Sequence, residues 1–179
     1  MSPKSTVYHF TIELSDVDRE VYEQLKLAVA LHPSESLEFM VTRVLAFALE
    51  FEEGIAFSPG LGSPDEPTVV VRGFDGSLRA WVDIGSPAAE RLHRAAKAAE
   101  RVAVYCHRSA EIVYLHLLES KVFRGGEIRF ISFQDGFIGR LAEALQKRNE
   151  LSISRSEQSL YVTINGDSTS SALAERRLG

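Results

Sequence analysis

The sequence predicts a mixed α/β domain, a mixed β-sheet flanked by helices, and three observations support this fold class. Short apolar stretches alternate with amphipathic ones in the order β, α, α, β-β, α, β, α, β, α, β-β. A strand, a helix and another strand follow one another with short links over residues 78–106, which predicts parallel strands. The apolar share of 45% is enough for a buried core. The length of 179 residues suits a single domain, expected over residues 1–166, with a polar and flexible tail over 167–179.

The first two predicted elements are a strand and a helix. Apolar and polar residues alternate from Tyr8 to Leu14, which is the period-two pattern of a strand. Ser15 and Asp18 then resemble a helix N-cap followed three residues later by an acid. The next apolar residues share one helical face, and they are Val21, Leu25, Ala28 and Val29. His32-Pro33 is expected to end this helix, because a residue before proline leaves the α region.

A second helix is predicted over residues 34–53, with Ser34 as its cap and Gly54 as its end. Apolar residues lie nearly all round this helix, so we expect it to be central and buried. The acid Glu38 therefore stands out on it.

The rest of the chain predicts a hairpin and then alternating elements. Residues 68–72 and 78–84 are expected to form two strands joined by the turn Gly73-Phe74-Asp75-Gly76. Ser86 and Pro87 suit the first positions of a helix that runs to about residue 101. The remaining predicted elements are a strand at 102–106, a helix at 110–119, a strand at 127–133, a helix at 136–147 and a strand pair at 151–156 and 160–165.

The charge, the cysteine count and the lack of targeting signals indicate where the protein is located and which partners it has. The net charge of −5 argues against a dedicated, non-specific nucleic-acid binder, although it says little about any one face. The one cysteine, Cys106, cannot form an internal disulfide. Residues 1–5 lack the apolar region of a signal peptide, and no apolar run is long enough to span a bilayer. We therefore expect a soluble cytoplasmic protein without a membrane partner.

Three acidic residues are candidates for a shared metal site. Asp65 lies in the loop before a predicted strand, Asp83 lies near the end of the next strand, and Glu38 lies on the buried helix. Mg²⁺ takes oxygen ligands, usually one or two carboxylates with water and phosphate, and it can activate water for phosphodiester hydrolysis. The alternative is structural: Asp65 would make an Asx turn, and Glu38 would pair with Arg43 or face solvent.

Several short motifs resemble the YaeQ family over nearly the whole chain, in order. They are the Tyr8 strand with Asp16, Asp18 and Arg19; His32-Pro33-Ser34-Glu35 with Glu38, Arg43, Leu45 and Ala46; Asp65-Glu66-Pro67; and Trp81-Val82-Asp83-Ile84-Gly85 with Pro87. YaeQ proteins belong to the large PD-(D/E)XK nuclease-like group. The resemblance therefore implies a restriction-endonuclease-like core, with a mixed central sheet flanked by helices.

Carried over by this resemblance, Pro64-Asp65 would be the PD element, Asp83 the acid of the (D/E)XK element and Glu38 the helix acid. The pattern departs from the family at Gly85, which stands where the motif has lysine. Basic residues that could replace this lysine are Arg91, Arg94, Lys97 and Lys121. Each is also explained as part of a solvated surface, and arginine is a poor substitute where a proton must move.

Three functions stay open at this stage. The first is a Mg²⁺-dependent nuclease or phosphodiesterase acting on nucleic acid through Asp65, Asp83 and Glu38. The second is a catalytically inactive protein that keeps the nuclease-like scaffold and binds a nucleic-acid or protein partner, which Gly85 and the acidic net charge favour. The third is a small-molecule phosphohydrolase that uses the same carboxylates. The sequence does not choose among them, and it does not indicate an oligomeric state.

Overall fold

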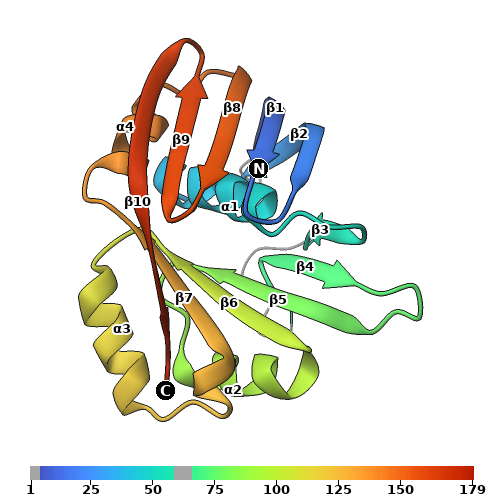
Figure 1. Ribbon diagram of the computed structural model, residues 1–179, viewed down its shortest axis with the longest axis vertical. Helices are drawn as coiled ribbons and strands as arrows, with labels where there is room; N and C mark the ends of the chain where they lie inside the picture. The colour runs from blue at the N-terminus through green and yellow to red at the C-terminus, as the bar shows by residue number, and fades with distance from the viewer. Residues whose placement is uncertain (1–4, 59–65) are drawn as a thin grey trace. The chain divides into compact units, whose positions relative to one another are not determined.

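Ten strands and four α-helices make up the part of the chain that the structure describes (Figure 1). The structure is a computed structural model, and it describes residues 5–58 and 66–179. Parallel and antiparallel strand pairs occur together, so the predicted mixed α/β class is confirmed. Contacts divide the chain into two compact units, residues 1–41 with 133–173 and residues 42–132 with 174–179. Within the described ranges, no helix is long and apolar enough to cross a membrane.

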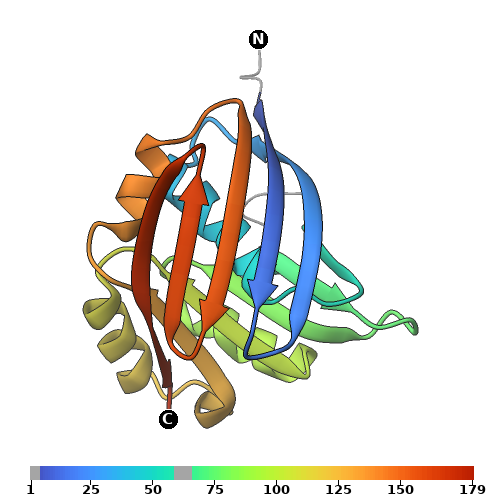
Figure 2. The same ribbon diagram turned by 45° about the horizontal axis from the view of Figure 1, so that its top comes forward.

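The first unit contains a run of strands in the order β2-β1-β8-β9-β10 (Figure 2). The pairing of β1 with β8 is parallel, and the other pairs are antiparallel. Along β1, Phe10, Ile12 and Leu14 are buried, while the polar residues between them are exposed. The elements of this unit are β1 (Thr6–Asp16), β2 (Val21–Leu31), α4 (Phe137–Glu143), β8 (Arg148–Ser156), β9 (Ser159–Ile164) and the first part of β10 (Asp167–Arg177).

Residues 21–31 form strand β2, so the helix predicted for this stretch is wrong. β2 pairs with all 11 residues of β1 in an antiparallel hairpin. Val21, Leu25 and Val29 are spaced four residues apart, and that spacing places them on one face of a strand as well as of a helix. Hydrogen bonding to a neighbouring strand of equal length decides between the two conformations.

Of the two residues that were predicted to cap a helix, Ser15 lies in β1 and Asp18 lies in the turn of this hairpin, next to Asp16 at the end of β1. Asp16 is fully buried and accepts hydrogen bonds from Arg19, at 3.3 Å from its backbone N–H and at 2.7 Å from its Nε. The Asp18 carboxylate accepts a hydrogen bond from the backbone N–H of Glu157 at 2.8 Å. These acids therefore fix a loop, because a carboxylate can satisfy backbone donors in a turn as well as at a helix end.

Helix α1 (Leu37–Leu49) is the predicted central helix, shorter than the expected range 34–53. Its cap is Ser36, whose Oγ accepts a hydrogen bond from the backbone N–H of Phe39 at 3.1 Å. Ser34 instead contacts His32, with 2.6 Å between Oγ and Nδ1. Every residue from 40 to 49 is buried, so the predicted burial of this helix is confirmed.

The second unit contains strands in the order β10-β7-β6-β5-β4-β3, with β10 contributing its last residues. β5 is parallel to β6, and β6 is parallel to β7, which confirms the predicted strand–helix–strand arrangement. The elements of this unit are β3 (Ile55–Phe57), β4 (Val69–Arg72), β5 (Leu78–Ile84), α2 (Ala89–Ala98), β6 (Arg101–Cys106), α3 (Ala110–Glu119), a 3-10 turn (Gly125–Glu127) and β7 (Ile128–Phe133).

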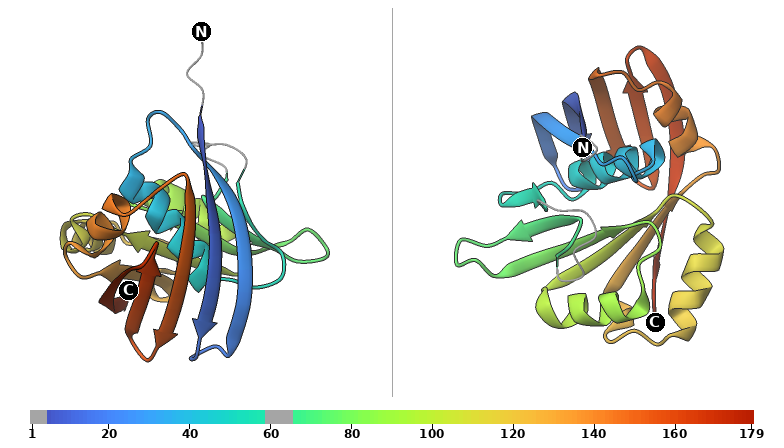
Figure 3. Two further views of the ribbon diagram at one scale, coloured as in Figure 1. Left: turned by 90° about the horizontal axis from the view of Figure 1, so that it is seen from above. Right: turned by 180° about the vertical axis from the view of Figure 1, so that it is seen from behind.

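Helices α2 and α3 cover one face of β5, β6 and β7 (Figure 3, right). Trp81, Val104 and Phe130 from these strands meet Leu92 of α2 and Leu117 of α3 in a common core. Residues two apart on a strand share a face, so Asp83 lies on the same helix-covered side as Trp81. This packing places the candidate acid inside the second unit.

Two further helices have boundaries that differ from the prediction, and one short strand was not predicted. α2 begins at Ala89 rather than near Ser86, and its N-cap residue Ala88 makes no side-chain capping bond. α4 ends at Glu143 rather than near residue 147. The short strand β3 was not predicted at all, because three residues carry no detectable periodicity.

Residues 167–177 form strand β10, so the prediction of a flexible tail is wrong for them. Residues 167–172 pair antiparallel with β9, and the N–H of Leu173 donates to the Gln158 carbonyl oxygen at 2.7 Å. Leu173 and Leu178 are buried. Most side chains of this segment are polar. The segment is nonetheless ordered, because its backbone forms hydrogen bonds with the neighbouring strand β9.

Candidate functional site

Asp83 lies near the end of β5, and Arg91 lies in the first turns of α2. Arg91 donates from Nε to Oδ2 of Asp83 at 2.7 Å and from Nη2 to Oδ1 at 3.0 Å. This two-bond geometry is the strong form of an arginine–carboxylate pair. The Asp83 side chain is 2% exposed and that of Arg91 20%, so the pair is largely removed from solvent.

Three further contacts hold Arg91 and Asp83 in place. Nη2 of Arg91 also donates to the carbonyl oxygen of Glu66. The guanidinium carbon lies 5.3 Å from the centroid of the Trp81 ring, within the range of a cation–π contact. The backbone N–H of Thr68 donates weakly to Oδ1 of Asp83, at 3.4 Å. Strand β5, helix α2 and the chain entering β4 therefore meet at this ion pair.

Gly85 explains why the expected lysine is missing from this strand. β5 ends at Ile84, and Gly85 has a left-handed backbone with φ of +87°. Its N–H donates to the carbonyl oxygen of Tyr105 at 2.8 Å. A lysine here would have to adopt a conformation that favours glycine. The turn that leads into α2 therefore disfavours a lysine at this position.

The other predicted site residues are placed as follows. The exposed Lys97 lies on α2, with its Nζ 5.8 Å from the centroid of the Phe123 ring. Lys121 follows α3 and is exposed, and among the described residues neither lysine pairs with an acid. Glu38 lies in the first turn of α1 and belongs to the first unit, whereas Asp83 belongs to the second. Pro64-Asp65 lies outside the described residues.

The structure therefore brings two of the predicted site residues together, Asp83 and Arg91. In the described ranges, no group of three or more histidine, cysteine, aspartate or glutamate side chains is arranged to hold a metal ion. Arg91 is one of the candidates to replace the motif lysine, and in the structure its charge is paired with Asp83, the candidate metal ligand. Both oxygens of Asp83 are occupied by a cationic donor, which opposes the binding of a second cation.

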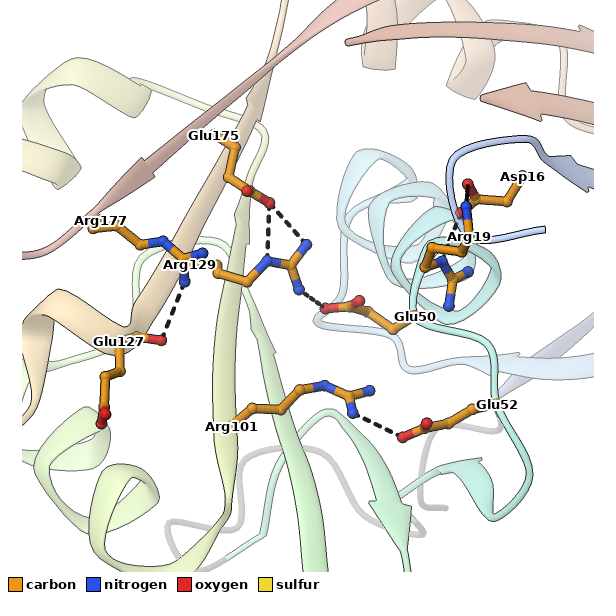
Figure 4. Close-up of polar contacts among 9 residues, drawn as sticks. All are labelled: Asp16, Arg19, Glu50, Glu52, Arg101, Glu127, Arg129, Glu175 and Arg177. Carbon is orange, nitrogen blue, oxygen red and sulfur yellow. Dashed lines mark hydrogen bonds and ion pairs between the residues drawn. The ribbon is translucent and has the colours of Figure 1, made fainter. Parts of the chain in front are cut away.

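A second charged cluster of the same unit was missed from the sequence. Arg129 on β7 donates from Nη1 to Glu50 at 2.6 Å and from Nε to Glu175 at 2.9 Å (Figure 4). Burial by itself lowers the pKa of Arg129, but the charges of Glu50, Tyr105 and Glu175 raise it, and the net direction is upward. The guanidinium is therefore fixed in its charged form, which suits an ion network rather than proton transfer.

Two sequence signals point to this cluster in retrospect. Glu50 directly follows the mostly apolar helix α1, and it is 4% exposed. Arg129 lies between the buried residues Ile128 and Phe130 on β7. A charged residue in either setting is costly to bury alone, so it indicates an unseen partner.

The comparisons with known proteins agree with one another. The family model described as "YaeQ protein" matches residues 1–173. The uncharacterized protein YaeQ of Salmonella typhi is 29% identical over 144 residues, which cover 80% of each chain. The uncharacterized protein YaeQ of Escherichia coli (strain K12) is 33% identical over 109 residues, 61% of this chain and 60% of that one.

Two crystal structures resemble this chain over almost its full length. The YaeQ protein from Pseudomonas syringae has a TM-score of 0.88 and 28% identity, and the match covers 96% of this chain and 95% of that one. The YaeQ protein from Xanthomonas axonopodis pv. citri has a TM-score of 0.89 and 25% identity, covering 96% of this chain and 98% of that one.

Proposed function

The chain belongs to the YaeQ family, and from this premise we propose that it is a binding or regulatory protein on a restriction-endonuclease-like scaffold, without metal-dependent cleavage of its own. One observation carries the proposal: Arg91 holds both carboxylate oxygens of Asp83 in a largely buried pair. In this role Asp83 and Arg91 are structural, and they fix the junction of β5, α2 and the chain before β4.

The side chains around Asp83 do not fit a Mg²⁺ ion in the described arrangement. A hard cation needs free carboxylate oxygens, and those of Asp83 are engaged by Arg91. A divalent ion about 4 Å from the guanidinium would meet a repulsion of several kcal/mol at the effective dielectric constant of a protein site. Arg91 cannot relieve this by losing its proton, because arginine stays charged.

Displacing Arg91 would also break its other contacts. The guanidinium would lose the Glu66 carbonyl oxygen and the face of the Trp81 ring together with Asp83. Breaking a buried ion pair by removing one partner typically costs about 3–5 kcal/mol. The ion pair is therefore expected to persist in the working protein.

The test is calorimetric titration of Mg²⁺ and Mn²⁺ into the wild type, Asp83→Asn and Arg91→Met, with a cleavage assay on single- and double-stranded DNA and on RNA. We expect no saturable binding and no cleavage by the wild type, and lower stability in both variants. Labelled DNA, RNA and nucleotides added to the same proteins would detect a nucleic-acid or small phosphate ligand. Metal-dependent cleavage by the wild type, lost in a well-folded Asp83→Asn protein, would overturn the proposal.

A metal-dependent nuclease is the second candidate, and one observation favours it. The carbonyl oxygen of Glu66 and the N–H of Thr68 both contact the Arg91–Asp83 pair, and these residues follow directly after Pro64-Asp65 in the sequence. For this candidate, Asp65, Asp83 and Glu38 are the proposed Mg²⁺ ligands, and Lys97 or Lys121 is the proposed replacement for the lysine. It requires Arg91 to leave Asp83, so Arg91→Met would increase metal affinity. Unchanged or absent metal binding in Arg91→Met would rule it out.

A further inference from the structure

A histidine and a serine meet in the loop that precedes helix α1. Nδ1 of His32 lies 2.6 Å from Oγ of Ser34, and both residues are exposed. A hydroxyl in contact with an imidazole nitrogen is the arrangement in which a weakly nucleophilic serine is activated. The loop belongs to the first unit, whereas Asp83 and Arg91 belong to the second. The proposed function therefore makes no use of this pair.

A backbone hydrogen bond identifies the ring nitrogen of His32 that can accept a proton. The N–H of Ser34 donates to Nδ1 of His32 at 3.1 Å. Because a backbone N–H is always a donor, Nδ1 is an acceptor here, and the hydrogen of the neutral ring is on Nε2. The Ser34 hydroxyl therefore donates to the same nitrogen. This is the direction of hydrogen bonding that general-base catalysis needs, because the proton leaves Oγ as Oγ attacks.

The backbone of His32 is held in place by Glu35. Oε1 of Glu35 accepts a hydrogen bond from the backbone N–H of His32 at 3.2 Å, and the backbone N–H of Glu35 donates to the His32 carbonyl oxygen at 2.8 Å. Pro33 lies between His32 and Ser34, and its ring restricts the backbone there. The surrounding loop therefore preorganises the pair, so little conformational freedom is lost when the hydroxyl reacts.

We propose that Ser34 is a nucleophilic serine with His32 as its general base, and that this pair hydrolyses small activated esters. Oγ of Ser34 bonds to the ester carbonyl carbon, and its proton moves to Nδ1 of His32. The bond to the leaving oxygen then breaks, and His32 returns the proton to that oxygen. Water attacks the acyl-serine with His32 again as the base, which releases the carboxylic acid and restores Ser34. Because both residues are exposed, the site suits small esters rather than substrates that need an enclosing pocket.

The contacts of His32 also determine which step is easiest to measure. In the described part of the chain, the His32 side chain bonds only to Ser34, so no carboxylate on Nε2 stabilises the protonated ring. We therefore expect slow turnover, and covalent trapping of Ser34 is the more direct readout. The reaction needs neither a metal ion nor Asp83, so it goes beyond the binding role proposed above.

The experiment treats the full chain with a fluorophosphonate probe in the presence of EDTA, and peptide mass spectrometry identifies the labelled residue. The probe's phosphorus bonds to a serine Oγ as fluoride leaves, which traps the first step. We expect labelling of Ser34 that is absent in Ser34→Ala. His32→Asn should slow the labelling by about tenfold or more, because the asparagine oxygen can still accept the Ser34 N–H but is not basic.

Ser120→Ala is the matched control, because Oγ of Ser120 donates to the backbone carbonyl oxygen of His116 at 2.8 Å, which is not a base. Ser34 of this variant should be labelled as fast as in the wild type. Hydrolysis of p-nitrophenyl acetate should be reduced in Ser34→Ala and His32→Asn but not in Ser120→Ala. Circular dichroism checks that each variant is folded. Two results overturn the proposal: Ser34 unmodified by excess probe, or His32→Asn labelled as fast as the wild type.

Discussion

At the scale of single residues, the sequence predicted the position of Asp83 on its strand but not its ion pair with Arg91. Asp83 was predicted near the end of a strand, and the structure places it there. Arg91 was one of several candidates to replace the motif lysine, and the structure pairs it with Asp83. Sequence spacing gives the face on which a side chain lies, but not the distance between side chains of different elements. For the same reason the pairing of Glu50 with Arg129 was not predicted.

The Arg91–Asp83 pair should stabilise the fold more than an exposed pair does. In a double-mutant cycle of Asp83→Asn and Arg91→Met, we expect each single change to lower the free energy of unfolding by about 2–4 kcal/mol, because it leaves a buried charge without its partner. The coupling between the two sites should be about 1.5–3 kcal/mol. Urea denaturation of the four proteins measures both quantities.

The control for this cycle is the pair Arg140–Asp167, which has a 3.0 Å contact but side chains 52% and 43% exposed. Its coupling should stay below about 1 kcal/mol, as is usual for surface ion pairs. Equal coupling at the two pairs would contradict a structural role for Asp83.

At the scale of elements, local patterns predicted most strands and helices, and they failed where a neighbouring strand decides the conformation. β4, β5, β6 and α3 were predicted within one or two residues, because their apolar periodicity and turn residues agree. β2 was taken for a helix, and β10 for a flexible tail. Both are ordered by backbone hydrogen bonds to strands that are adjacent in space, a condition that no pattern within the segment reveals.

The choice of helix cap gives one prediction at this scale. Ser36→Ala should lower the free energy of unfolding by about 1 kcal/mol, because it removes the acceptor for the N–H of Phe39. Ser34→Ala should have an effect of no more than a few tenths of a kcal/mol, since Ser34 makes an exposed contact with His32. Thermal unfolding of both variants separates the two. A larger effect of Ser34→Ala would indicate that Ser34 caps the helix, as the sequence predicted.

The end of the chain gives a second prediction at this scale. Leu178 is 2% exposed in the core of the second unit, and its N–H donates to the Gly125 carbonyl oxygen at 3.0 Å. Leu178→Ala should therefore lower the free energy of unfolding by about 2–4 kcal/mol. Leu115→Ala removes the same atoms from a half-exposed position and should change it by less than about 1 kcal/mol. Similar losses in the two variants, measured by urea denaturation, would mean that Leu178 is not packed as described.

At the scale of the whole molecule, the fold class followed from the order of the elements, whereas the pairing of distant segments did not. The first unit combines residues 1–41 with residues 133–173, and β10 contributes to both units. Composition and periodicity are local quantities, so they cannot state which strands become neighbours. The resemblance to the YaeQ family implied a mixed sheet flanked by helices but not these pairings, and the two YaeQ crystal structures resemble the chain over 96% of its length.

Cys106 reports on opening of the second unit. It is 1% exposed, and burial raises the pKa of its thiol above the usual value. A thiol reagent at pH 8 should therefore label it only through unfolding, at a rate that rises with urea as unfolding does. The pKa of the Cys106 thiol is higher in the folded protein than in the unfolded chain, so the neutral thiol contributes to stability. This contribution is complete below the pKa of the thiol in the unfolded chain, and it is lost as the pH rises through its pKa in the folded protein. Cys106→Ala should lack this alkaline loss, and rapid labelling of the native protein would contradict the burial.

The parallel pairing of β1 with β8 has a consequence for how fast the chain can fold. The side chain of Asn149 at the start of β8 donates to the carbonyl oxygen of His9 on β1, across 140 positions of sequence. A contact of that separation forms only after a long loop has closed, so high contact order should make refolding slow. The β1–β2 hairpin can form early, and its apolar face then stays exposed to solvent until β8 pairs with β1. The refolding yield should therefore fall as the protein concentration rises, because the unpaired edge of β1 can pair with another copy of the chain before β8 pairs with it.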